Sequence, residues 1–533
     1  MTIYLDHAAT TPVDARVAAR MAAVLADPQA QANPASATHG PGLRAGDTVE
    51  EARRQVARLI GAEPREIIFT SGATEANNLA ILGVAAAARR ARAREPGRPQ
   101  GHFVSSRVEH KSVLDPLRQL EKEGFAVTLL EPDETGRVPP EAVDAAMRAD
   151  TLLVTLMLAN NEIGVLNDVA AIGRRVRSRG VLLHTDASQA VGKLPVDVEA
   201  LNVDFLALTA HKFYGPKGVG ALYVREAARP RIAPIQFGGG HERGLRSGTL
   251  PTHQLVGLGE AAALASEALA HDMAHARDLT ARLWRELEGI PGVELNSRAD
   301  GAPGILNVSF PGIEGESLIT ALTDIAVSTG SACSSASREP SYVLRALGRD
   351  TELAQSSLRI SLGRGTTAAD VDVAATAIRS QVTRLRQLAG SEGAAASVPD
   401  AMPRVPPGSL LGRLLNETSR RYFLAPPRAP RFHDGDLPEG VRHGRAGRQA
   451  EGAHVLFELE IGGGFVKSAR FSAYGCPHTL AVTSWLCEVS EGRRIDAGPP
   501  GTPVEWAEKF QVPAEKLGRL LVVEDALRAA FGS

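Results

Sequence analysis

The chain has 533 residues and a formal net charge of -2, with 44% hydrophobic and 23% charged residues. This composition is typical of a folded globular protein and excludes collagen, coiled coil and wholesale disorder, while the charge supplies no basic field for nucleic acid. Because a single hydrophobic core stops growing at about 250 to 300 residues, we expect two or three domains.

The first 388 residues alternate short apolar runs with helical stretches rich in Ala, Leu and Arg. This alternation predicts an α/β fold around a mostly parallel sheet, with a large lobe over residues 1–258 and a small lobe over 259–388. Ligands bind beyond the carboxyl ends of strands in such sheets, where this sequence turns polar. Strands are expected at residues 66–70, 102–106, 151–158, 181–187, 205–210, 220–224 and 305–310.

The last part of the chain is set off by a change in composition. Residues 389–408 are rich in Ala, Gly, Ser and Pro without a periodic apolar face, which predicts a flexible linker. Residues 409–533 predict a separate small α+β domain. Its strand-like runs are 454–461 and 466–475, and its helical runs are 479–490 and 515–531.

Cysteine usage and the N-terminus indicate the compartment. The three cysteines, Cys333, Cys476 and Cys487, are too sparse for a disulfide framework and favour a reducing environment. Asp6 and His7 stand where a signal peptide would be apolar, and no segment approaches the roughly 20 apolar residues of a membrane span. We therefore expect a cytoplasmic protein without a membrane or nucleic-acid partner.

A first candidate site follows the strand at 66–70. Residues 71–75, Ser-Gly-Ala-Thr-Glu, lead into a helical run, so free backbone N–H groups and the Thr74 hydroxyl would meet at a helix N-terminus. Such a site suits an anion such as phosphate. The same residues would also cap a helix without any ligand.

Three further side chains at strand ends suit a pyridine cofactor. Asp186 would keep a ring nitrogen protonated, Lys212 would bind the cofactor covalently and His110 would stack on the ring. Taken singly, each has a structural alternative: a helix-capping Asp, a surface Lys and a core His. Their occurrence together favours the cofactor.

The segment 203–224, V-D-F-L-A-L-T-A-H-K-F-Y-G-P-K-G-V-G-A-L-Y-V, resembles cysteine desulfurases of the iron–sulfur assembly type, which are pyridoxal-phosphate enzymes related to class-V aminotransferases. The resemblance spans about 380 residues. Further matching segments are Y-L-D-H-A-A-T-T-P at 4–12, F-T-S-G-A-T-E-A-N-N at 69–78, N-N-E-I-G at 160–164, H-T-D-A-S-Q-A-V-G-K at 184–193, R-S-G-T-L-P at 246–251 and S-T-G-S-A-C-S-S-A at 328–336.

The resemblance implies the aspartate aminotransferase-like fold of pyridoxal-phosphate transferases, with L-cysteine as substrate. Thr249 resembles a phosphate contact that the family borrows from the neighbouring subunit, which implies a homodimer. Asn161 and Arg359 resemble substrate contacts, Arg359 as the bidentate clamp of the substrate carboxylate. The implied cofactor contacts are Ala73, Thr74, His110, Asn161, Asp186, Gln189, Thr209, His211, Lys212 and Thr249.

Cys333 is the residue on which the implied reaction turns. It stands in a loop rich in Ser, Gly and Ala, which disfavours the role of a small buried hydrophobe. By analogy, a proton leaves the substrate α-carbon and the Cys333 thiolate attacks the substrate sulfur, so that alanine and a persulfide result. Lys212 and His110 are the candidate proton carriers.

Residues 455–531 resemble the iron–sulfur scaffold proteins that receive sulfur from such enzymes, through A-R-F-S-A-Y-G-C-P-H-T-L-A-V-T-S at 469–484 and V-E-D-A-L-R-A-A at 523–530. Scaffolds carry three ligand cysteines, whereas here only Cys476 matches. The segment 443–452 has no cysteine, and Arg519 stands at the third position.

A thiolate metal site needs about four donors, so we expect no cluster on this domain alone. Cys476 is then a sulfur acceptor or a residual ligand in a domain that relays sulfur or binds a partner. The binding module is the favoured alternative.

Two other functions remain open at this stage. A selenocysteine lyase would share the fold, and comparing selenium with sulfur release would separate the two. A non-catalytic scaffold or regulatory protein would stay colourless with added pyridoxal phosphate. The final sulfur acceptor, whether an iron–sulfur scaffold, thiolated RNA or another cofactor, is not determined by the sequence.

Overall fold

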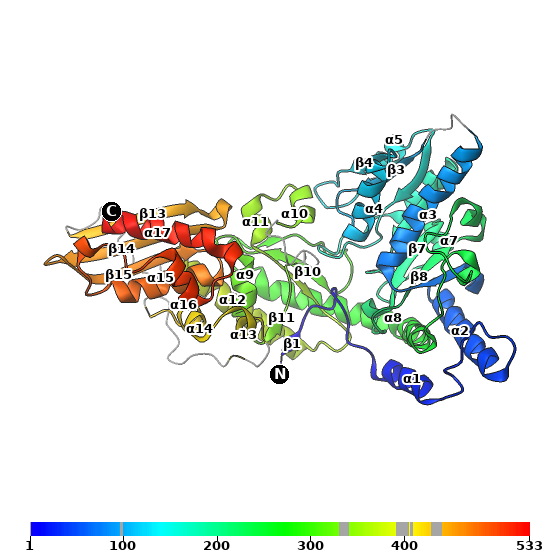
Figure 1. The fold of residues 1–533 in the computed structure, drawn as a ribbon, viewed down its shortest axis with the longest axis horizontal. Helices are drawn as coiled ribbons and strands as arrows, with labels where there is room; N and C mark the ends of the chain where they lie inside the picture. The colour runs from blue at the N-terminus through cyan, green and yellow to red at the C-terminus, as the bar shows by residue number, and fades with distance from the viewer. Residues whose placement is uncertain are drawn as a thin grey trace.

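The computed structural model describes residues 2–95, 100–329, 340–390, 405, 409–427 and 440–532. These residues form a large lobe, a small lobe and a C-terminal domain in an elongated row (Figure 1). The chain starts in the small lobe, where β1 (Ile3–Tyr4) pairs in parallel with β11 (Ile325–Ala326). Among the helices that the structure describes, none has the length and apolarity of a bilayer crossing.

The large lobe is built on a seven-stranded sheet in the order β2-β8-β7-β6-β5-β3-β4. Neighbours from β7 to β4 are parallel, while β8 is antiparallel to both of its neighbours, as expected for a mostly parallel sheet. The strands are β2 (Ile67–Thr70), β3 (His102–Ser106), β4 (Ala126–Leu130), β5 (Thr151–Thr155), β6 (Leu182–Asp186), β7 (Phe205–Thr209) and β8 (Gly220–Val224).

Alternate side chains of these strands enter two apolar clusters on opposite faces of the sheet. One cluster includes side chains of α2, α6 and α8, and the other includes side chains of α3 and α4. Coverage on both faces explains why the strands read as continuous apolar runs. The helices of this lobe are α1 (Ala15–Ala26), α2 (Gly40–Leu59), α3 (Ala73–Arg94), α4 (Lys111–Lys122), α5 (Pro140–Ala146), α6 (Val169–Ser178) and α7 (Val198–Leu201).

Helix α8 (Thr252–Leu287) packs against α1 and α2 of the large lobe and against α12 of the small lobe. The expected lobe boundary at residues 258 and 259 falls inside this continuous helix. The small lobe has an antiparallel sheet in the order β12-β10-β9. Its elements are β9 (Glu294–Leu295), β10 (Ile305–Ser309), α9 (Gly315–Ala321), α10 (Tyr342–Ala346), α11 (Thr351–Gln355), β12 (Ser357–Ser361) and α12 (Ala368–Leu388).

The C-terminal domain is an antiparallel sheet, β13-β14-β15, packed against α15 and α17. Strand β13 covers most of the segment 443–452. It was not predicted, because the Arg and Gly residues of this segment do not form the apolar pattern of a strand. The elements are α13 (Leu410–Leu414), α14 (Glu417–Leu424), β13 (Val441–Arg448), β14 (Ala453–Gly462), β15 (Phe465–Tyr474), α15 (Pro477–Ser490), α16 (Pro503–Phe510) and α17 (Leu517–Phe531).

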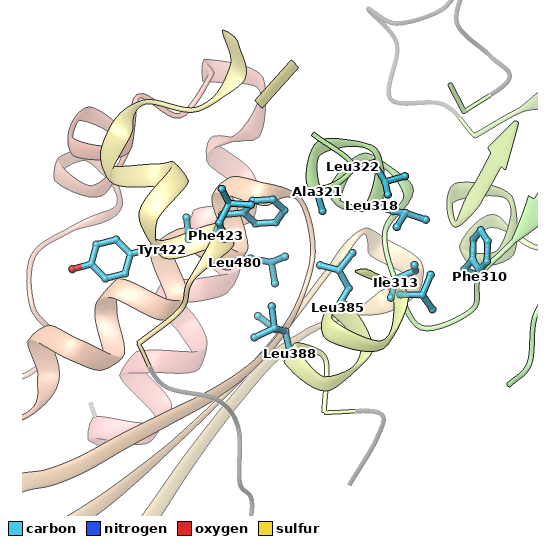
Figure 2. Packing of buried hydrophobic residues seen from close by; sticks show 14 of the residues in the cluster. Phe310, Ile313, Leu318, Ala321, Leu322, Leu385, Leu388, Tyr422, Phe423 and Leu480 are labelled. Carbon is cyan, nitrogen blue, oxygen red and sulfur yellow. The ribbon is translucent and has the colours of Figure 1, made fainter. Parts of the chain in front are cut away.

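This domain shares one hydrophobic cluster with the small lobe. Leu318 of α9 and Leu385 of α12 lie in the same packed region as Phe423 of α14 and Leu480 of α15 (Figure 2). The hydroxyl of Ser317 donates a 2.7 Å hydrogen bond to the carbonyl of Gly475 across the contact. The domain is therefore docked on the small lobe, a point that the sequence left undetermined. Except for residues 389, 390 and 405, the predicted linker at 389–408 lies outside the described residues.

We expect Phe423→Ala to lower the free energy of unfolding by about 3 to 5 kcal/mol, because it removes a fully buried ring from the shared cluster. Urea denaturation of the full chain measures this effect. Phe465→Ala is the matched control, since that ring is 45% exposed and should cost less than about 1 kcal/mol. Equal losses for the two variants would show that the shared cluster does not stabilise the docked domain.

Candidate active site

A cavity of about 620 Å³ lies where the carboxyl ends of β6 and β7 meet the N-terminus of α3. It is large enough for a small cofactor with its substrate. Thr249 is not part of its lining and contributes to a separate surface pocket, and Cys333 lies outside the described residues. The predicted site residues that line the cavity are Ala73, Thr74, His110, Asn161, Asp186, Gln189, Thr209, His211, Lys212 and Arg359.

The start of α3 forms the anion-binding end of the cavity. Gly72 precedes the helix with φ of 151°, a conformation that favours glycine, and its backbone faces the Thr209 hydroxyl. A Cβ at Gly72 would lie 3.7 Å from Thr209 Oγ1, so a side chain there would fill the space between the helix and β7. Free N–H groups and the Thr74 hydroxyl remain to bind a phosphate.

Asp186 ends β6 and is 7% exposed. Asn77 Nδ2 donates to one of its carboxylate oxygens at 2.7 Å, and Ser188 N donates to the other at 2.9 Å. These two donors fix the orientation of the carboxylate at the cavity wall. Asn77 and Ser188 were not among the predicted site residues, although both stand in the segments that carry the family resemblance.

Lys212 ends the 3-10 turn Ala210–Lys212 directly after β7. Its Nζ donates hydrogen bonds to the carbonyl oxygens of Ala8 and Ala9, at 2.8 Å for Ala9, so the N-terminal segment holds the amine in the cavity. Neighbouring His211 bonds the Thr10 hydroxyl through Nδ1 at 3.1 Å. Burial, together with the charges of nearby lysines, lowers the pKa of His211 to about 4 and keeps it neutral.

Arg359, in β12, also lines the cavity. Its Nη2 donates to Asp6 Oδ1 at 2.7 Å, and its Nη1 donates to the Asn161 carbonyl at 2.9 Å. Asp6 was missed as a site residue, although it stands in the matching segment at 4–12. The guanidinium is thus held in place at the cavity by two acceptors.

His110 lines the cavity and also caps α4, since its Nδ1 accepts a hydrogen bond from Ser112 N at 3.1 Å. The hydroxyl of Ser112 lies 2.8 Å from the same Nδ1 and accepts from Asn77 Nδ2 at 2.9 Å. Because Asn77 also bonds Asp186, a chain of hydrogen bonds joins the imidazole to the carboxylate. The capping role and the cavity role therefore coexist in this histidine.

Together these groups fit pyridoxal phosphate. The cavity offers an amine for the aldehyde, a carboxylate for the ring nitrogen and a helix N-terminus for the phosphate. The space between Gly72 and the Thr209 hydroxyl, which a Cβ at residue 72 would occupy, suits the phosphate group of the cofactor.

Comparison with known proteins agrees with this geometry. Residues 3–373 match the class-V aminotransferase family. The cysteine desulfurase IscS of Salmonella arizonae is 54% identical over 389 residues, which cover 73% of this chain and 94% of the relative. The chain belongs to the cysteine desulfurases of this family.

Solved structures and a second family match extend the comparison. A NifS-like protein aligns with a TM-score of 0.65 at 35% identity over 72% of this chain and 100% of its own. DndA from Streptomyces lividans aligns with a TM-score of 0.56 at 40% identity, over 68% of this chain and 99% of its own. Residues 426–533 match the NifU-like N-terminal domain, so the desulfurase is fused to a NifU-like domain.

In the NifU-like domain, Cys476 precedes α15 and is fully buried. Its Sγ lies 3.4 Å from Thr479 Oγ1, and the guanidinium of Arg519 lies near the thiol. Arg519 also pairs with Glu314 of the small lobe at 3.3 Å. Within the described residues no group of three or more His, Cys, Asp or Glu side chains is arranged for a metal ion.

His478 predicts a pH dependence of stability. Burial, together with the charge of Lys516, lowers its pKa to about 4, below the usual 6.5. The stabilisation is therefore complete above pH 6.5 and is lost as the pH falls toward about 4, because the unfolded chain takes up the proton first.

His478 should contribute about 3 kcal/mol to the loss of stability over this range, and His211, whose pKa is also lowered to about 4, should add its own loss. The loss measured by urea unfolding should therefore be smaller in His478→Phe than in the parent chain by about 3 kcal/mol. The full loss should persist in His271→Gln, since the side chain of His271 is 80% exposed. The same pH dependence in all three proteins would contradict the assignment to His478.

Proposed function

We propose that this desulfurase converts L-cysteine to L-alanine and holds the released sulfur as a persulfide on Cys333. The observation that carries the proposal is the single cavity that unites Lys212, Asp186 and the N-terminus of α3 with Arg359. An aldehyde-binding amine, a ring-nitrogen partner and a carboxylate clamp are the groups that amino-acid chemistry on this cofactor requires.

Pyridoxal phosphate, when bound, supplies a ring that withdraws the electron pair left at the substrate α-carbon. Asp186, held by Asn77 and Ser188, would bind the ring nitrogen, and the α3 N-terminus with Thr74, Thr209 and His211 would bind the phosphate. The amine of Lys212 would take the α-proton of L-cysteine, and His110 is the second proton carrier.

Substrate orientation falls to Arg359. Its guanidinium, already fixed by Asp6 and the Asn161 carbonyl, would bind the α-carboxylate of L-cysteine at the cavity wall. Because the ion pair with Asp6 fixes the arginine before substrate arrives, little side-chain freedom is lost on binding.

Sulfur transfer then involves Cys333. The Cys333 thiolate attacks the substrate sulfur, the S–S bond forms, and the C–S bond breaks with its electron pair left on the substrate carbon. Protonation of that carbon gives L-alanine. The thiol and L-cysteine thus become a persulfide and L-alanine without an external oxidant.

We also propose a homodimer. Thr249 lies outside the cavity of its own chain and lines a surface pocket with Asn33, Pro34 and His253. A phosphate contact from this residue would therefore have to reach the cavity of a second copy. A cytoplasmic location is proposed as well, because the described cysteines Cys476 and Cys487 form no disulfide, as a reducing compartment favours.

For the NifU-like domain we propose docking and recruitment of an acceptor rather than sulfur relay. The thiol of Cys476 is fully buried. Arg519 lies near this thiol and forms an ion pair with Glu314 of the small lobe. A buried thiol cannot meet a persulfide unless the domain leaves this position. Sulfur on Cys333 would then pass to a separate acceptor, for which an iron–sulfur scaffold is our proposal.

Peptide mass spectrometry after incubation with L-cysteine, without reductant, tests both proposals. We expect one added sulfur on Cys333 and none on Cys476 or Cys487. If sulfur is found on Cys476 in the parent chain but not in Cys333→Ala, the NifU-like domain is a sulfur relay and the recruitment proposal is wrong. Alanine formation without sulfur on Cys333 would overturn the assignment of the persulfide.

A further inference from the structure

A lysine that the proposed mechanism does not use lies behind the cavity wall. Lys193 Nζ donates a 2.8 Å hydrogen bond to Gln189 Oε1, and Gln189 Nε2 donates a 2.8 Å bond to the Ala8 carbonyl. The same carbonyl accepts from Lys212 Nζ. A continuous chain of hydrogen bonds therefore links Lys193 to the amine of Lys212.

Gln189 lines the cavity and is 3% exposed, whereas Lys193 does not line the cavity. The side-chain oxygen of Gln189 accepts from Lys193, and one of its two amide hydrogens is donated to the Ala8 carbonyl. The second amide hydrogen is therefore available to a group in the cavity. In the flipped amide, an NH₂ group would face the donor on Lys193 and the carbonyl oxygen would face the Ala8 carbonyl. Both contacts would be repulsive, so Lys193 and Ala8 together select one orientation.

The surroundings of Lys193 are mostly cationic. Burial and the charges of Lys212 and Arg359 lower the pKa of Lys193 to about 7. Lys193 also lines a small cavity of about 30 Å³ together with His7, Tyr214, Asp272 and Arg364. Both the ammonium and the neutral amine carry an N–H group for Gln189, so the contact does not depend on the charge.

We propose that Lys193 is a positioning residue that fixes the Gln189 amide so that an N–H group, and not the carbonyl oxygen, faces the bound cofactor. The inference rests on the proposed function, since it concerns the pyridoxal-phosphate cavity. An N–H donor suits the electron-rich oxygen on the pyridoxal ring, whereas a carbonyl oxygen there would repel it.

The test compares full-length Lys193→Met, Gln189→Ala and the double variant with the parent chain. For each, the affinity of the apo protein for pyridoxal phosphate and the pH midpoint of the bound cofactor's visible absorption band are measured. We expect each single variant to weaken binding about tenfold and to move the midpoint in the same direction. Lys193→Met should have no further effect in the Gln189→Ala background, because it acts through that amide.

A residue that merely fills space would lower the melting temperature and leave the cofactor affinity and the band midpoint unchanged, and that result would overturn the proposal. Additive effects in the double variant would overturn it too. If Lys193→Met does not fold, the same two measurements are made on Gln189→Glu. Its carboxylate still accepts a hydrogen bond from Lys193 but offers no N–H group to the cofactor. Parent-like cofactor binding by Gln189→Glu would sink the inference. Failure of the parent chain to bind pyridoxal phosphate would instead refute the proposed function.

Discussion

Replacing Lys212 with alanine is expected to lower kcat/KM for L-cysteine by at least about 10³-fold. The amine is the group that would bind the cofactor covalently and move the α-proton, and the Ala8 and Ala9 carbonyls hold it in the cavity. Alanine formed per active site, measured by chromatography, gives the rate. Borohydride reduction followed by peptide mapping shows whether the cofactor mass is attached to residue 212.

Lys122→Ala is the control for this variant, because Lys122 is exposed on α4 and does not line the cavity. Its kcat/KM and its cofactor content should match those of the parent. Lys217 also lines the cavity. Cofactor reduced onto Lys217 in the parent chain would show that the covalent role had been given to the wrong lysine.

Cys333→Ala should separate cofactor binding from sulfur transfer. We expect the variant to keep the absorption band of bound pyridoxal phosphate, because no described contact of the cavity depends on residue 333. Alanine formation should fall at least about 10³-fold, since the nucleophile for the substrate sulfur is gone. Absorption spectra and single-turnover alanine assays measure the two effects on one sample.

The matched control is Cys487→Ala, a buried cysteine of the NifU-like domain outside the proposed chemistry. Its alanine formation should equal that of the parent. A Cys333→Ala protein that still forms alanine at the parent rate would mean that a small thiol or another residue takes the sulfur.

Much of the catalytic part could be predicted from the sequence, because its information is local. The strands at residues 102–106 and 220–224 were predicted with the observed bounds, and others differ by a few residues at their ends. Strand β7 is apolar from Phe205 to Leu208 and then turns polar at Thr209, so the position of Lys212 after β7 follows from the chain itself. The family resemblance predicted further residues that line the cavity, although Thr249 does not.

Contacts between distant segments could not be predicted. Asp6 meets Arg359 across 353 positions of the chain, and Lys212 meets the Ala8 carbonyl across 204. The spacing of these residues in the sequence does not predict that they meet. Their contact depends on the pairing of β1 with β11 and on the turn that follows β1. Lys193 illustrates the same limit, since its bond to Gln189 is local but its place behind the cavity wall is not.

The sequence by itself determined the fold class, the cofactor chemistry and the presence of a fused domain, because strand and helix periodicity and short motifs are written along the chain. Only the tertiary structure decided that the NifU-like domain packs onto the small lobe and that Cys476 is buried there beside Arg519. The reason is physical. Apolar residues such as Phe423 and Leu385 would be buried by any core, and only packing decides which domain supplies the partner surface.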